Sequence, residues 1–434
     1  GPDGLLITSV IHRQQAHDDY SETDQNEMSD VKEFDLLIAG GGLAGTSIAC
    51  ALDSVGISTA IIESVAMDAS SQPSFDDRAI ALSWGSRRIF EGIGIWDAIA
   101  TTATPINHIH ISEKGRFGQA HLDAQEESVE ALGYVALARD IGHALHQRML
   151  DSKVHRFCPA TLVDFKVDDE RVTTTIEANG ETETVTAKLL IAADGKESGI
   201  RQALGIESRE SAYNQAAIVS NLLPGKPHEN IAYERFTNEG PLALLPMTDN
   251  RFGVVLTVPQ EEVEEYLALD DAAFIEEVQK RIGFRCGRFQ QAGKRASYPL
   301  VLMRTDAITA QRVALVGNAA HALHPISGQG FNLGLRDIAA LVDVITDAIR
   351  QDEDPGSDAV LQKYAEWRKQ DVRSITLATD ALARIFSNPL VGVGTGRSAG
   401  LVATDLLPGL RHRIAKHAMG VLGKQPRLGR GLPL

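Results

Sequence analysis

The stretch that decides the fold runs from Phe34 to Glu63 and reads FDLLIAGGGLAGTSIACALDSVGISTAIIE. The apolar residues 34–39 predict a strand, the glycines a tight turn, residues 45–55 a helix, and residues 58–63 a second strand. This strand–helix–strand order is typical of a parallel sheet that binds a nucleotide at the carboxyl ends of its strands. We therefore expect a Rossmann-like domain to open the folded part of an α/β (α+β) protein.

The glycine turn has the spacing G-x-G-x-x-G, and the next predicted strand ends in an acid. Glycine permits the tight turn and a close backbone approach, while the helix N-terminus offers N–H groups to a pyrophosphate. A carboxylate about 20 residues further on accepts hydrogen bonds from ribose hydroxyls. The predicted dinucleotide-binding residues are Gly40, Gly42, Leu43, Ala44, Gly45 and Glu63.

Composition limits the remaining possibilities. The chain has 434 residues, 42 Lys+Arg and 58 Asp+Glu, giving a net charge of −16. This charge disfavours nucleic acid as a partner, and the length predicts two or three domains. The cysteines Cys50, Cys158 and Cys286 form no CxxC pair, which argues against a disulfide framework and favours a reducing, cytoplasmic location.

Changes in pattern along the chain predict five segments. Residues 1–33 are polar and are expected to be a disordered lead-in or an expression remnant, with Met28 a plausible native start. Residues 34–212 and 304–350 are expected to form the two parts of the nucleotide-binding domain. Residues 213–303 read as an inserted antiparallel substrate-binding sheet with one helix, and residues 351–434 as a helical region with a basic tail.

Further motifs follow in a characteristic order. Residues 76–83 read DDRAIALS, Asp194–Gly195 follows a predicted buried strand, and residues 317–321 read GNAAH after another. Residues 324–334 then read HPISGQGFNLG and lead into a long predicted helix. Together these motifs resemble the FAD-dependent aromatic hydroxylases of the p-hydroxybenzoate hydroxylase fold, over essentially residues 34–386.

Three segments point to one group within this superfamily. FDDRAIAL (75–82), YERFT (233–237) and GPLALLPM (240–247) look like the ubiquinone-biosynthesis hydroxylases, most of all the 2-polyprenyl-6-methoxyphenol hydroxylase (UbiH-type) branch. One position departs from the wider superfamily, because the usual Gly-Asp before Ala-Ala-His is here Gly317–Asn318. Asparagine still offers an acceptor and a donor to a ribitol hydroxyl, but it carries no charge.

The resemblance implies FAD as cofactor and NAD(P)H as co-substrate, and it assigns residues to both the cofactor and the flavin ring. Donors at the start of the predicted helix at Gly330 would stabilise negative charge that develops on the ring. No side-chain acid or base is assigned. The implied FAD-binding residues are Arg78, Arg139, Leu162, Asp194, Gly195, Gly317, Asn318, Gly328, Gly330 and Asn332, and the implied flavin-ring environment is Pro325, Gly328, Gln329, Gly330 and Asn332.

Several of these residues keep a second interpretation. Arg78 also reads as a surface arginine beside an acidic pair, Arg139 as a plain cation at a helix start, and Asp194 as a strand-end turn acid. His321 and His324 are three residues apart without an acidic third ligand in their loop. We expect them to pack near the HPISGQGFNLG segment at residues 324–334, which we call the flavin-loop motif. We predict no metal site.

The implied reaction is a monooxygenation in which a flavin hydroperoxide, formed with NAD(P)H and O2, hydroxylates a polyprenylated (methoxy)phenol in ubiquinone biosynthesis. Two alternatives stay open. The chain could hydroxylate small soluble phenols, or it could serve as a weakly active FAD-bound scaffold within a quinone-synthesis complex, for which the neutral Asn318 is a mild hint.

The C-terminal segment is opposite in charge to the rest of the chain. After Asp405 there is no acid, and the pattern of apolar residues predicts an amphipathic helix over residues 408–422. This helix could contact the anionic inner face of the cytoplasmic membrane or a quinone-synthesis partner, or it could dock on the acidic body of its own chain. The six cations are Arg411, Arg413, Lys416, Lys424, Arg427 and Arg430.

Overall fold

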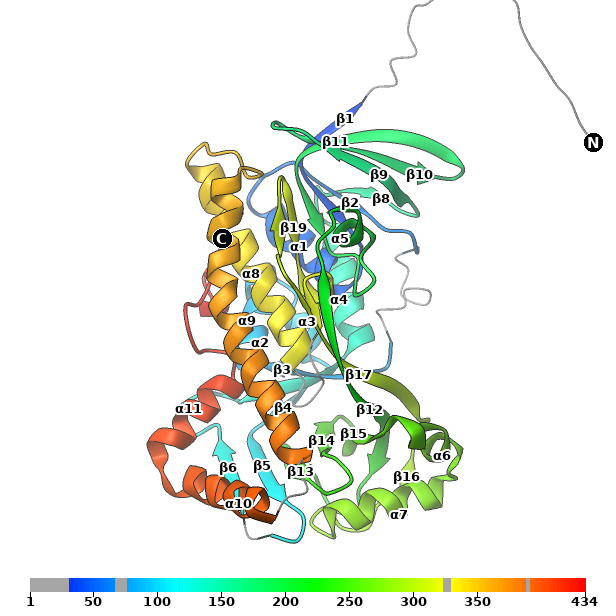
Figure 1. Cartoon of the computed structure of the whole chain (residues 1–434), viewed down its shortest axis with the longest axis vertical. Helices are drawn as coiled ribbons and strands as arrows, with labels where there is room; N and C mark the ends of the chain where they lie inside the picture. The colour runs from blue at the N-terminus through cyan, green and yellow to red at the C-terminus, as the bar shows by residue number, and fades with distance from the viewer. Residues whose placement is uncertain (1–30, 67–75, 117, 323–328, 388–390) are drawn as a thin grey trace, which may run out of the picture.

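The computed structural model describes residues 31–66, 76–116, 118–322, 329–387 and 391–434, and it contains three sheets (Figure 1). A sheet of mainly parallel strands lies at one end of the molecule and a mainly antiparallel sheet at the other. No helix among the described residues combines the length and apolar character needed to cross a bilayer.

The first sheet has the strand order β18-β19-β11-β1-β2-β8, and β1, β2, β8, β11 and β19 run parallel. The antiparallel strands β9 and β10 extend β11 into a meander. The strands of this sheet are β1 (Lys32–Ala39), β2 (Thr59–Ile62), β8 (His155–Phe157), β9 (Thr161–Val167), β10 (Val172–Ala178), β11 (Glu181–Ala192), β18 (Thr309–Ala310) and β19 (Val313–Leu315).

The two faces of this sheet bury different side chains. Leu36 and Ile38 of β1 point into a core formed with α1, α2, α4, α8 and α9, whereas Leu37 packs on the opposite side with the meander and α5. Residues buried on both faces are typical of a parallel sheet. The helices of this part are α1 (Leu43–Asp53), α2 (Trp84–Ile93), α3 (Trp96–Ala100), α4 (Ala138–Leu150), α5 (Gly199–Ala203), α8 (Gln329–Arg350) and α9 (Asp358–Ser387), together with η2 (Gly317–Ala319).

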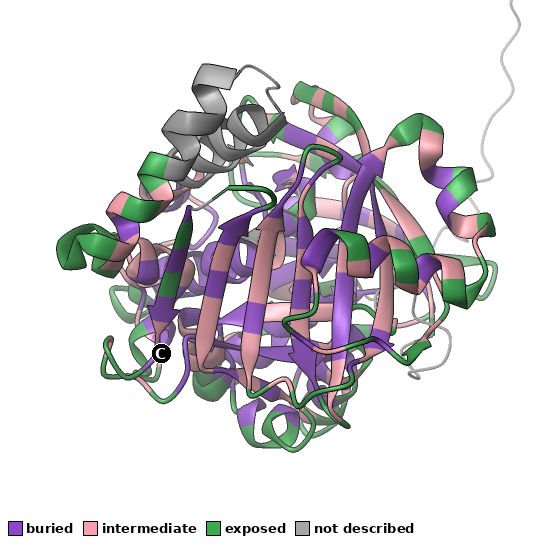
Figure 2. Cartoon of the chain, turned by 90° about the horizontal axis from the view of Figure 1, so that it is seen from below, coloured by how far each residue is buried: buried purple, intermediate pink, exposed green. Residues whose placement is uncertain are grey.

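The second sheet has the order β20-β17-β12-β15-β14-β13-β5-β6, with β16 paired to β12. Every neighbouring pair is antiparallel except β13 and β5. Figure 2 shows buried and half-buried residues across its central strands. Its elements are β5 (His108–Glu113), β6 (Gln119–Asp123), β12 (Ser208–Leu223), β13 (Ile231–Phe236), β14 (Leu242–Met247), β15 (Arg251–Pro259), β16 (Gln291–Ala292), β17 (Ala296–Thr305) and β20 (His321–Ala322), with η1 (Gln260–Glu262), α6 (Val263–Ala268) and α7 (Asp271–Ile282).

A third, three-stranded sheet lies between the other two. It consists of β3 (Ala79–Ser83), β7 (Gly133–Leu137) and β4 (Thr104–Ile106), all antiparallel. Val135 and Ile106 of this sheet pack against Ala232 and Met247 of the second sheet. The small sheet therefore connects the nucleotide-binding part to the strands of the large antiparallel sheet.

The chain ends in α10 (Val391–Leu406), α11 (Pro408–Ala418) and η4 (Leu428–Arg430). The inner side of α11 is covered, because Ala415 and Met419 are buried against Leu122 and Leu132. Ion pairs add to this contact, with Arg411 Nε 3.0 Å from a Glu126 oxygen. Of the three placements expected for the predicted helix, the structure therefore shows the one docked on its own chain, and the helix ends at residue 418 rather than 422.

The fold class predicted from the sequence is confirmed, with three differences in detail. The strands expected at 182–186 and 189–193 form the single strand β11. The second sheet includes β5 and β6 from outside residues 213–303, because β13 pairs with β5. The expected boundaries at 213 and 303 lie inside β12 and β17, a long antiparallel pair that continues from one part of the molecule into the other.

Candidate active site

The turn between β1 and α1 requires glycine at two motif positions. Gly40 has a φ of +104°, and a Cβ there would lie 2.3 Å from the carbonyl oxygen of Ala193. A Cβ on Gly45 would lie 1.8 Å from the carbonyl oxygen of Gly40. Gly42 caps α1 without a side-chain hydrogen bond, and no acid lies in the first turn, so this helix end is suited to an anion such as a pyrophosphate.

Glu63 follows β2 and lies beside this turn. It is only 8% exposed, and its Oε2 accepts a hydrogen bond of 2.5 Å from the backbone N–H of Gly41. Its Oε1 accepts another, of 2.8 Å, from the N–H of Val65. Glu63 therefore holds the glycine turn directly. Its predicted contact with a ribose stays a prediction.

The loops after β11 and β19 reach the same edge of the sheet as the glycine turn. The N–H of Ala193 donates to the carbonyl of Ala39 at 2.8 Å, and the N–H of Val316 donates to that of Ala192 at 3.1 Å. Since these strands are parallel, their carboxyl ends lie side by side. The three motifs, separated by more than 250 residues in sequence, thus meet at one place, where open α/β sheets bind their ligands.

Asp194 and Gly195 occupy the loop after β11. Oδ2 of Asp194 accepts a hydrogen bond of 3.3 Å from the N–H of Ile200, while its buried Oδ1 has no hydrogen-bond partner in the described chain. A buried acceptor without a partner is costly unless a ligand or water supplies a donor. Gly195 has a φ of +86°, which favours glycine at this position.

Gly317 and Asn318 bring the loop after β19 against both α1 and α8. A Cβ on Gly317 would lie 3.6 Å from the Ala44 side chain, and a Cβ on Gly334 of α8 would lie 3.4 Å from Gly317. Gly317 is buried, whereas the Asn318 side chain is exposed. Asn318 is therefore available to a ligand at this edge, as its predicted role requires.

Asn332 lies in the first turns of α8 and is 3% exposed. Its Oδ1 accepts hydrogen bonds from the Ser83 N–H at 2.8 Å and the Ser86 hydroxyl at 2.7 Å. Its Nδ2 donates to the carbonyl of Ala81 at 2.9 Å. The side chain thus anchors α8 to β3 and α2, which leaves only its backbone for the predicted contact with a flavin.

Arg78 and Arg139 are adjacent because β3 pairs with β7. The N–H of Arg139 donates to the carbonyl of Asp76 at 2.9 Å, and Arg78 Nε lies 2.6 Å from an Asp76 carboxylate oxygen. Arg139 contacts Asp77 at 2.5 Å. The Arg78 guanidinium also lies 5.4 Å from the centre of the Tyr298 ring. Both arginines carry acidic partners, and their contacts with FAD stay predictions.

The other predicted residues are placed only in part. Pro325 and Gly328 lie outside the described residues, and Gln329 and Gly330 begin α8. Leu162 lies in β9 opposite Ile176 and packs on the core of the meander. The FAD contact that the resemblance implies for Leu162 therefore stays a prediction.

Next to the site, the structure contains a buried network of charged side chains that the sequence patterns did not predict. Asp337 of α8 is fully buried between His321, whose Nε2 lies 2.8 Å away, and Arg368, whose Nε lies 2.7 Å away. Arg368 also contacts Asp371 at 2.6 Å, and Asp371 contacts Arg336 at 2.5 Å. The sequence signal is the charged pair Arg336–Asp337 directly before the apolar run at residues 338–342 of α8. His321 packs as expected, and the described residues hold no metal-binding cluster.

Burial alone would raise the pKa of Asp337, but the nearby His321 and Arg368 outweigh it and keep the pKa below its ordinary value. The carboxylate therefore stays charged. It joins β20, which ends just before the motif at residues 324–334, to α8, which begins within that motif. We conclude that the network holds both ends of this segment in place.

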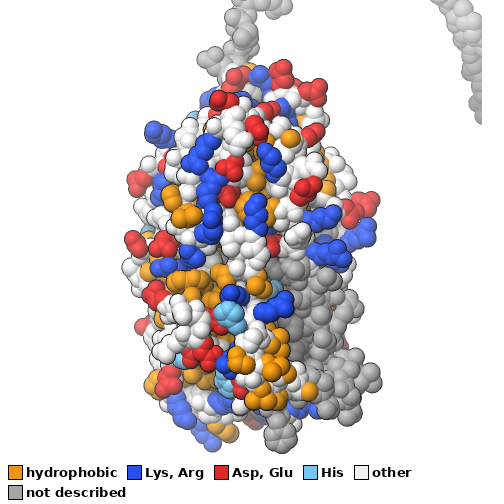
Figure 3. Space-filling view, turned by 90° about the vertical axis from the view of Figure 1, so that its left-hand side faces the viewer, with side chains coloured by type: hydrophobic (Ala, Val, Ile, Leu, Met, Phe, Trp, Pro, Cys, Tyr) orange, Lys and Arg blue, Asp and Glu red, His pale blue; other side chains and the backbone are white. Residues whose placement is uncertain are grey.

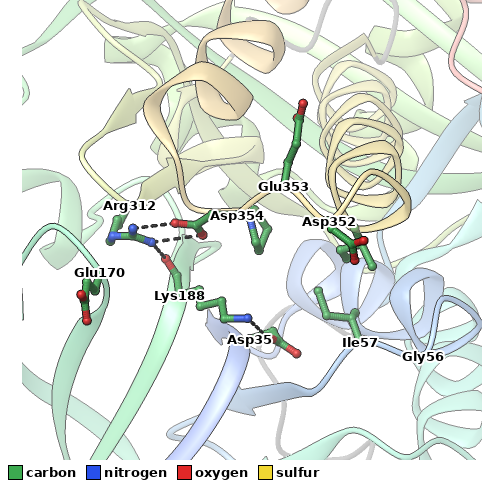
Figure 4. Close-up of a pocket in the computed structure, with 11 residues that line it drawn as sticks. Asp35, Gly56, Ile57, Glu170, Lys188, Arg312, Asp352, Glu353 and Asp354 are labelled. Carbon is green, nitrogen blue, oxygen red and sulfur yellow. Dashed lines mark hydrogen bonds and ion pairs between the residues drawn. The ribbon is translucent and has the colours of Figure 1, made fainter.

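A cavity of about 510 Å³ lies elsewhere, at the opposite edge of the parallel sheet (Figure 4). Its wall includes Asp35 and Lys188, which form an ion pair of 2.8 Å, and Arg312, which contacts Asp354 at 2.6 Å. These residues lie toward the amino-terminal side of the parallel segments of β1, β11 and β19. The cavity is therefore separate from the edge where the glycine turn, Asp194 and Gly317 meet.

The residues at the carboxyl edge fit FAD. An uncapped helix end suits its pyrophosphate, and a buried carboxylate oxygen without a partner suits a hydroxyl or amide donor. A separate, mainly antiparallel sheet lies on the far side of the Arg78 loop, where Tyr298 of β17 lies against the Arg78 guanidinium. The fold and the site together define a flavin-dependent hydroxylase.

Comparisons with known proteins agree with this class of protein. The family model described as FAD binding domain matches residues 33–379. The ubiquinone hydroxylase UbiL of Rhodospirillum rubrum is 35% identical over 407 residues, covering 93% of this chain and 94% of that protein. The 3-demethoxyubiquinol 3-hydroxylase of Escherichia coli K12 is 30% identical over 394 residues, covering 89% and 98%. The chain belongs to the FAD-binding-domain family of FAD-dependent monooxygenases that includes these hydroxylases.

A solved structure shows the same fold. The p-nitrophenol 4-monooxygenase PnpA of Pseudomonas putida DLL-E4 superposes with a TM-score of 0.74, covering 91% of this chain and 100% of that one, at 16% identity. At this identity the likeness is evidence of fold alone. It agrees with the predicted p-hydroxybenzoate hydroxylase architecture, whose cofactor is FAD.

Proposed function

We propose that this chain hydroxylates the aromatic ring of a polyprenylated (methoxy)phenol on the route to ubiquinone. The observation that carries the proposal is the match to ubiquinone hydroxylases along nearly the whole chain, including the substrate-side sheet as well as the cofactor motifs. When bound, FAD supplies the redox chemistry, the transfer of electrons from NAD(P)H to O2.

The chain's own residues would bind and orient the reactants. The N-terminus of α1 would hold the pyrophosphate, Glu63 a ribose, and Asp194 with Asn318 the ribitol side. The first turn of α8, anchored through Asn332, would direct backbone N–H groups and its positive end toward the ring. The antiparallel sheet would hold the phenol against the flavin and exclude water from it.

The proposal is tested on purified protein with its flavin, whose visible spectrum reports occupancy. We expect a prenylated methoxyphenol to accelerate NAD(P)H oxidation and to gain one oxygen atom from ¹⁸O2, measured by mass spectrometry. The same phenol without its prenyl chain is the matched control and should be a poorer substrate. Equal turnover of both phenols would instead indicate a hydroxylase of small phenols, and bound flavin without oxygen incorporation would indicate a scaffold.

A polyprenyl chain is insoluble in water, so we further propose that the protein contacts an anionic membrane peripherally through its C-terminal segment. The docked part of the tail is not free for this, but the junction of α10 and α11 is. Leu406 is 71% exposed, Leu407 55%, Leu410 40% and Val402 37%. Arg413 is exposed one turn after Leu410. Figure 3 faces this side and shows hydrophobic side chains gathered near its lower end with cationic ones beside them.

Charge supports an anionic lipid surface as the occupant of this patch, defined as Val402, Leu406, Leu407, Leu410 and Arg413. The whole chain carries a net charge of −16 and would be repelled by anionic lipid, so only a locally basic and apolar region can approach it. Apolar residues at an interface then insert among the acyl chains. The patch offers four apolar side chains for insertion and one exposed cation, Arg413, for the lipid phosphates.

Vesicle cosedimentation tests this contact, with phosphatidylcholine vesicles prepared with and without phosphatidylglycerol. We expect binding only to the anionic vesicles, and a loss of about tenfold or more in the Leu406→Gln, Leu407→Gln double variant, because burying one leucine is worth about 1.5–3 kcal/mol. The control is Leu150→Gln, since Leu150 is 46% exposed on α4, outside the patch. Equal losses in the two variants would contradict the proposal.

A further inference from the structure

Glu234 carries a carboxylate in the middle of the large antiparallel sheet. It lies on β13 between Tyr233 and Arg235, whose side chains point to the opposite face, as strand alternation requires. Arg235 donates to the carbonyl of Arg281 on α7 at 2.8 Å and to the Ser112 hydroxyl at 2.9 Å. Glu234 therefore faces away from the helices α6 and α7 that cover the other side of the sheet.

The face that carries Glu234 is turned toward the cofactor-binding part of the molecule. Ala232, two residues before Glu234 and on the same face, packs with Ile106 and Val135 of the small three-stranded sheet. On β17 of the same sheet, Tyr298 lies under the Arg78 guanidinium at 5.4 Å. Glu234 is thus on the side of the sheet where a substrate would lie between the sheet and the flavin.

The immediate neighbours of Glu234 are apolar. In the register of the sheet, Ile111 of β5 and Ala243 of β14 lie directly beside it on the same face. The carboxylate of Glu234 makes no hydrogen bond or ion pair to any other part of the described chain, and the residue is half-buried. Since charged side chains are rarely placed this deep without a partner, the carboxylate calls for a functional explanation.

The surrounding surface fits an aromatic, lipid-like molecule. Several residues of the same sheet face are half-buried in the interior of the fold, so that part of their apolar surface stays uncovered. An uncovered apolar surface with one polar group is typical of a small-molecule site. These residues are Ile111, Val219, Ala243, Leu245, Val255 and Tyr298.

We infer that Glu234 is the base that accepts the proton of the substrate's ring hydroxyl. This inference rests on the proposed function, because it assigns a role toward the same phenol. In the step, the O–H bond of the phenol breaks, the proton bonds to a Glu234 carboxylate oxygen, and the electron pair stays on the phenolate oxygen. No oxidant or reductant is consumed, and the phenolate makes the ring carbons beside and opposite its oxygen richer in electrons.

The electrostatics of the site suit this transfer. A phenol has an ordinary pKa near 10 and is neutral at pH 7, so it needs a base whose pKa lies near the working pH. Burial raises the pKa of Glu234 to about 7. The titratable or charged groups of the described chain that face this side include Glu113 on β5, which is buried and 3.4 Å from Arg116, Arg251 on β15, which lies 3.6 Å from Asp249, Tyr298 on β17, and Arg78.

The variant Glu234→Gln, in the holoenzyme, tests the role. We expect kcat for a prenylated phenol to fall by about 10²–10⁴-fold, as for loss of a general base. The rise of kcat with pH through an apparent pKa near 7 should disappear. Glu234→Asp should restore part of the rate. Glu229→Gln, which alters an exposed carboxylate just before β13, is the matched control and should keep both the rate and the pH profile.

A series of substrates separates a base from a structural residue. Ring-fluorinated prenylphenols that are already ionised at the assay pH need no base, so Glu234→Gln should turn them over nearly as fast as the wild type. The flavin spectrum should be unchanged. An equal loss for ionised and neutral phenols, or an unchanged pH profile, would overturn the inference. If the wild type itself hydroxylates none of these phenols, the proposed function fails instead.

Discussion

The charged network behind the flavin-loop motif predicts a measurable loss of stability when its central carboxylate is neutralised. Asp337 has no exposed surface and contacts both His321 and Arg368. Removing one partner of a buried ion pair costs about 3–5 kcal/mol. Arg368 keeps Asp371 as a second partner, so we expect Asp337→Asn to fall at the lower end, about 3 kcal/mol.

This free energy corresponds to a small but clear shift in Tm. Unfolding a chain of 434 residues as one unit, at about 2.1 cal/mol/K per residue, has an entropy of about 0.9 kcal/mol/K. The Tm should therefore fall by about 3 °C, and by more if a smaller part unfolds independently. Thermal unfolding followed by the release of flavin fluorescence measures it.

The control is Asp306→Asn, because Asp306 pairs with Arg209 at 3.4 Å where both side chains are exposed. Exposed pairs contribute about 0–1 kcal/mol, so this variant should shift the Tm by about 1 °C or less. Since the pKa of Asp337 lies below its ordinary 3.8, its stabilisation is complete above that pH and is lost as the pH falls further. Equal Tm values for the two variants at pH 7 would refute the reasoning.

Three further outcomes follow from the same structure. Gly40→Ala should abolish flavin retention on gel filtration, because its Cβ would lie 2.3 Å from the carbonyl oxygen of Ala193; a yellow variant would contradict this. Glu63→Gln should weaken FAD binding in apoprotein titrations by about tenfold to a hundredfold, since the hydrogen bond that holds the Gly41 N–H, worth about 1.5–3 kcal/mol, loses its charge; an unchanged Kd would contradict this role of Glu63. Iodoacetamide should modify Cys158 before Cys50, because burial raises the pKa of Cys50 to about 12; peptide mass mapping decides the order.

Local sequence patterns predicted individual helices and strands well. They did not predict how strands from distant parts of the chain pair. The helix at 271–282 was placed correctly because Asp270 caps its start and Gly283 ends it, both of which are local signals. The break expected near Ala187 was wrong. There the sequence changes from alternating to continuously apolar, which marks a change in burial within β11 and not its end. The pairing of β13 with β5 joins segments more than 100 residues apart and has no local signal.

In the candidate site, too, the residues with local signals were predicted and the roles that depend on distant partners were not. Spacing and residue type identified Gly40, Asp194 and Gly317, because turns at strand ends require particular residues, and the structure brings these three together. The side-chain role of Asn332 was not predictable, since its partners Ser83 and Ala81 lie about 250 residues earlier. Nor could a single sequence show which face of a strand looks toward the flavin.

The C-terminal segment separates into a structural part and an exposed part, and this decides how its role can be tested. A Cβ on Gly92 of α2 would lie 2.5 Å from the Leu428 side chain, so the tail packs tightly on that helix. Arg336 of α8 donates to the carbonyls of Gly420 at 2.8 Å and Leu422 at 2.9 Å. Deleting the whole tail would leave a buried guanidinium of the charged network without these acceptors. Lost membrane binding after such a deletion would therefore be confounded with damage to the cofactor domain, whereas substitutions at the exposed leucines avoid this.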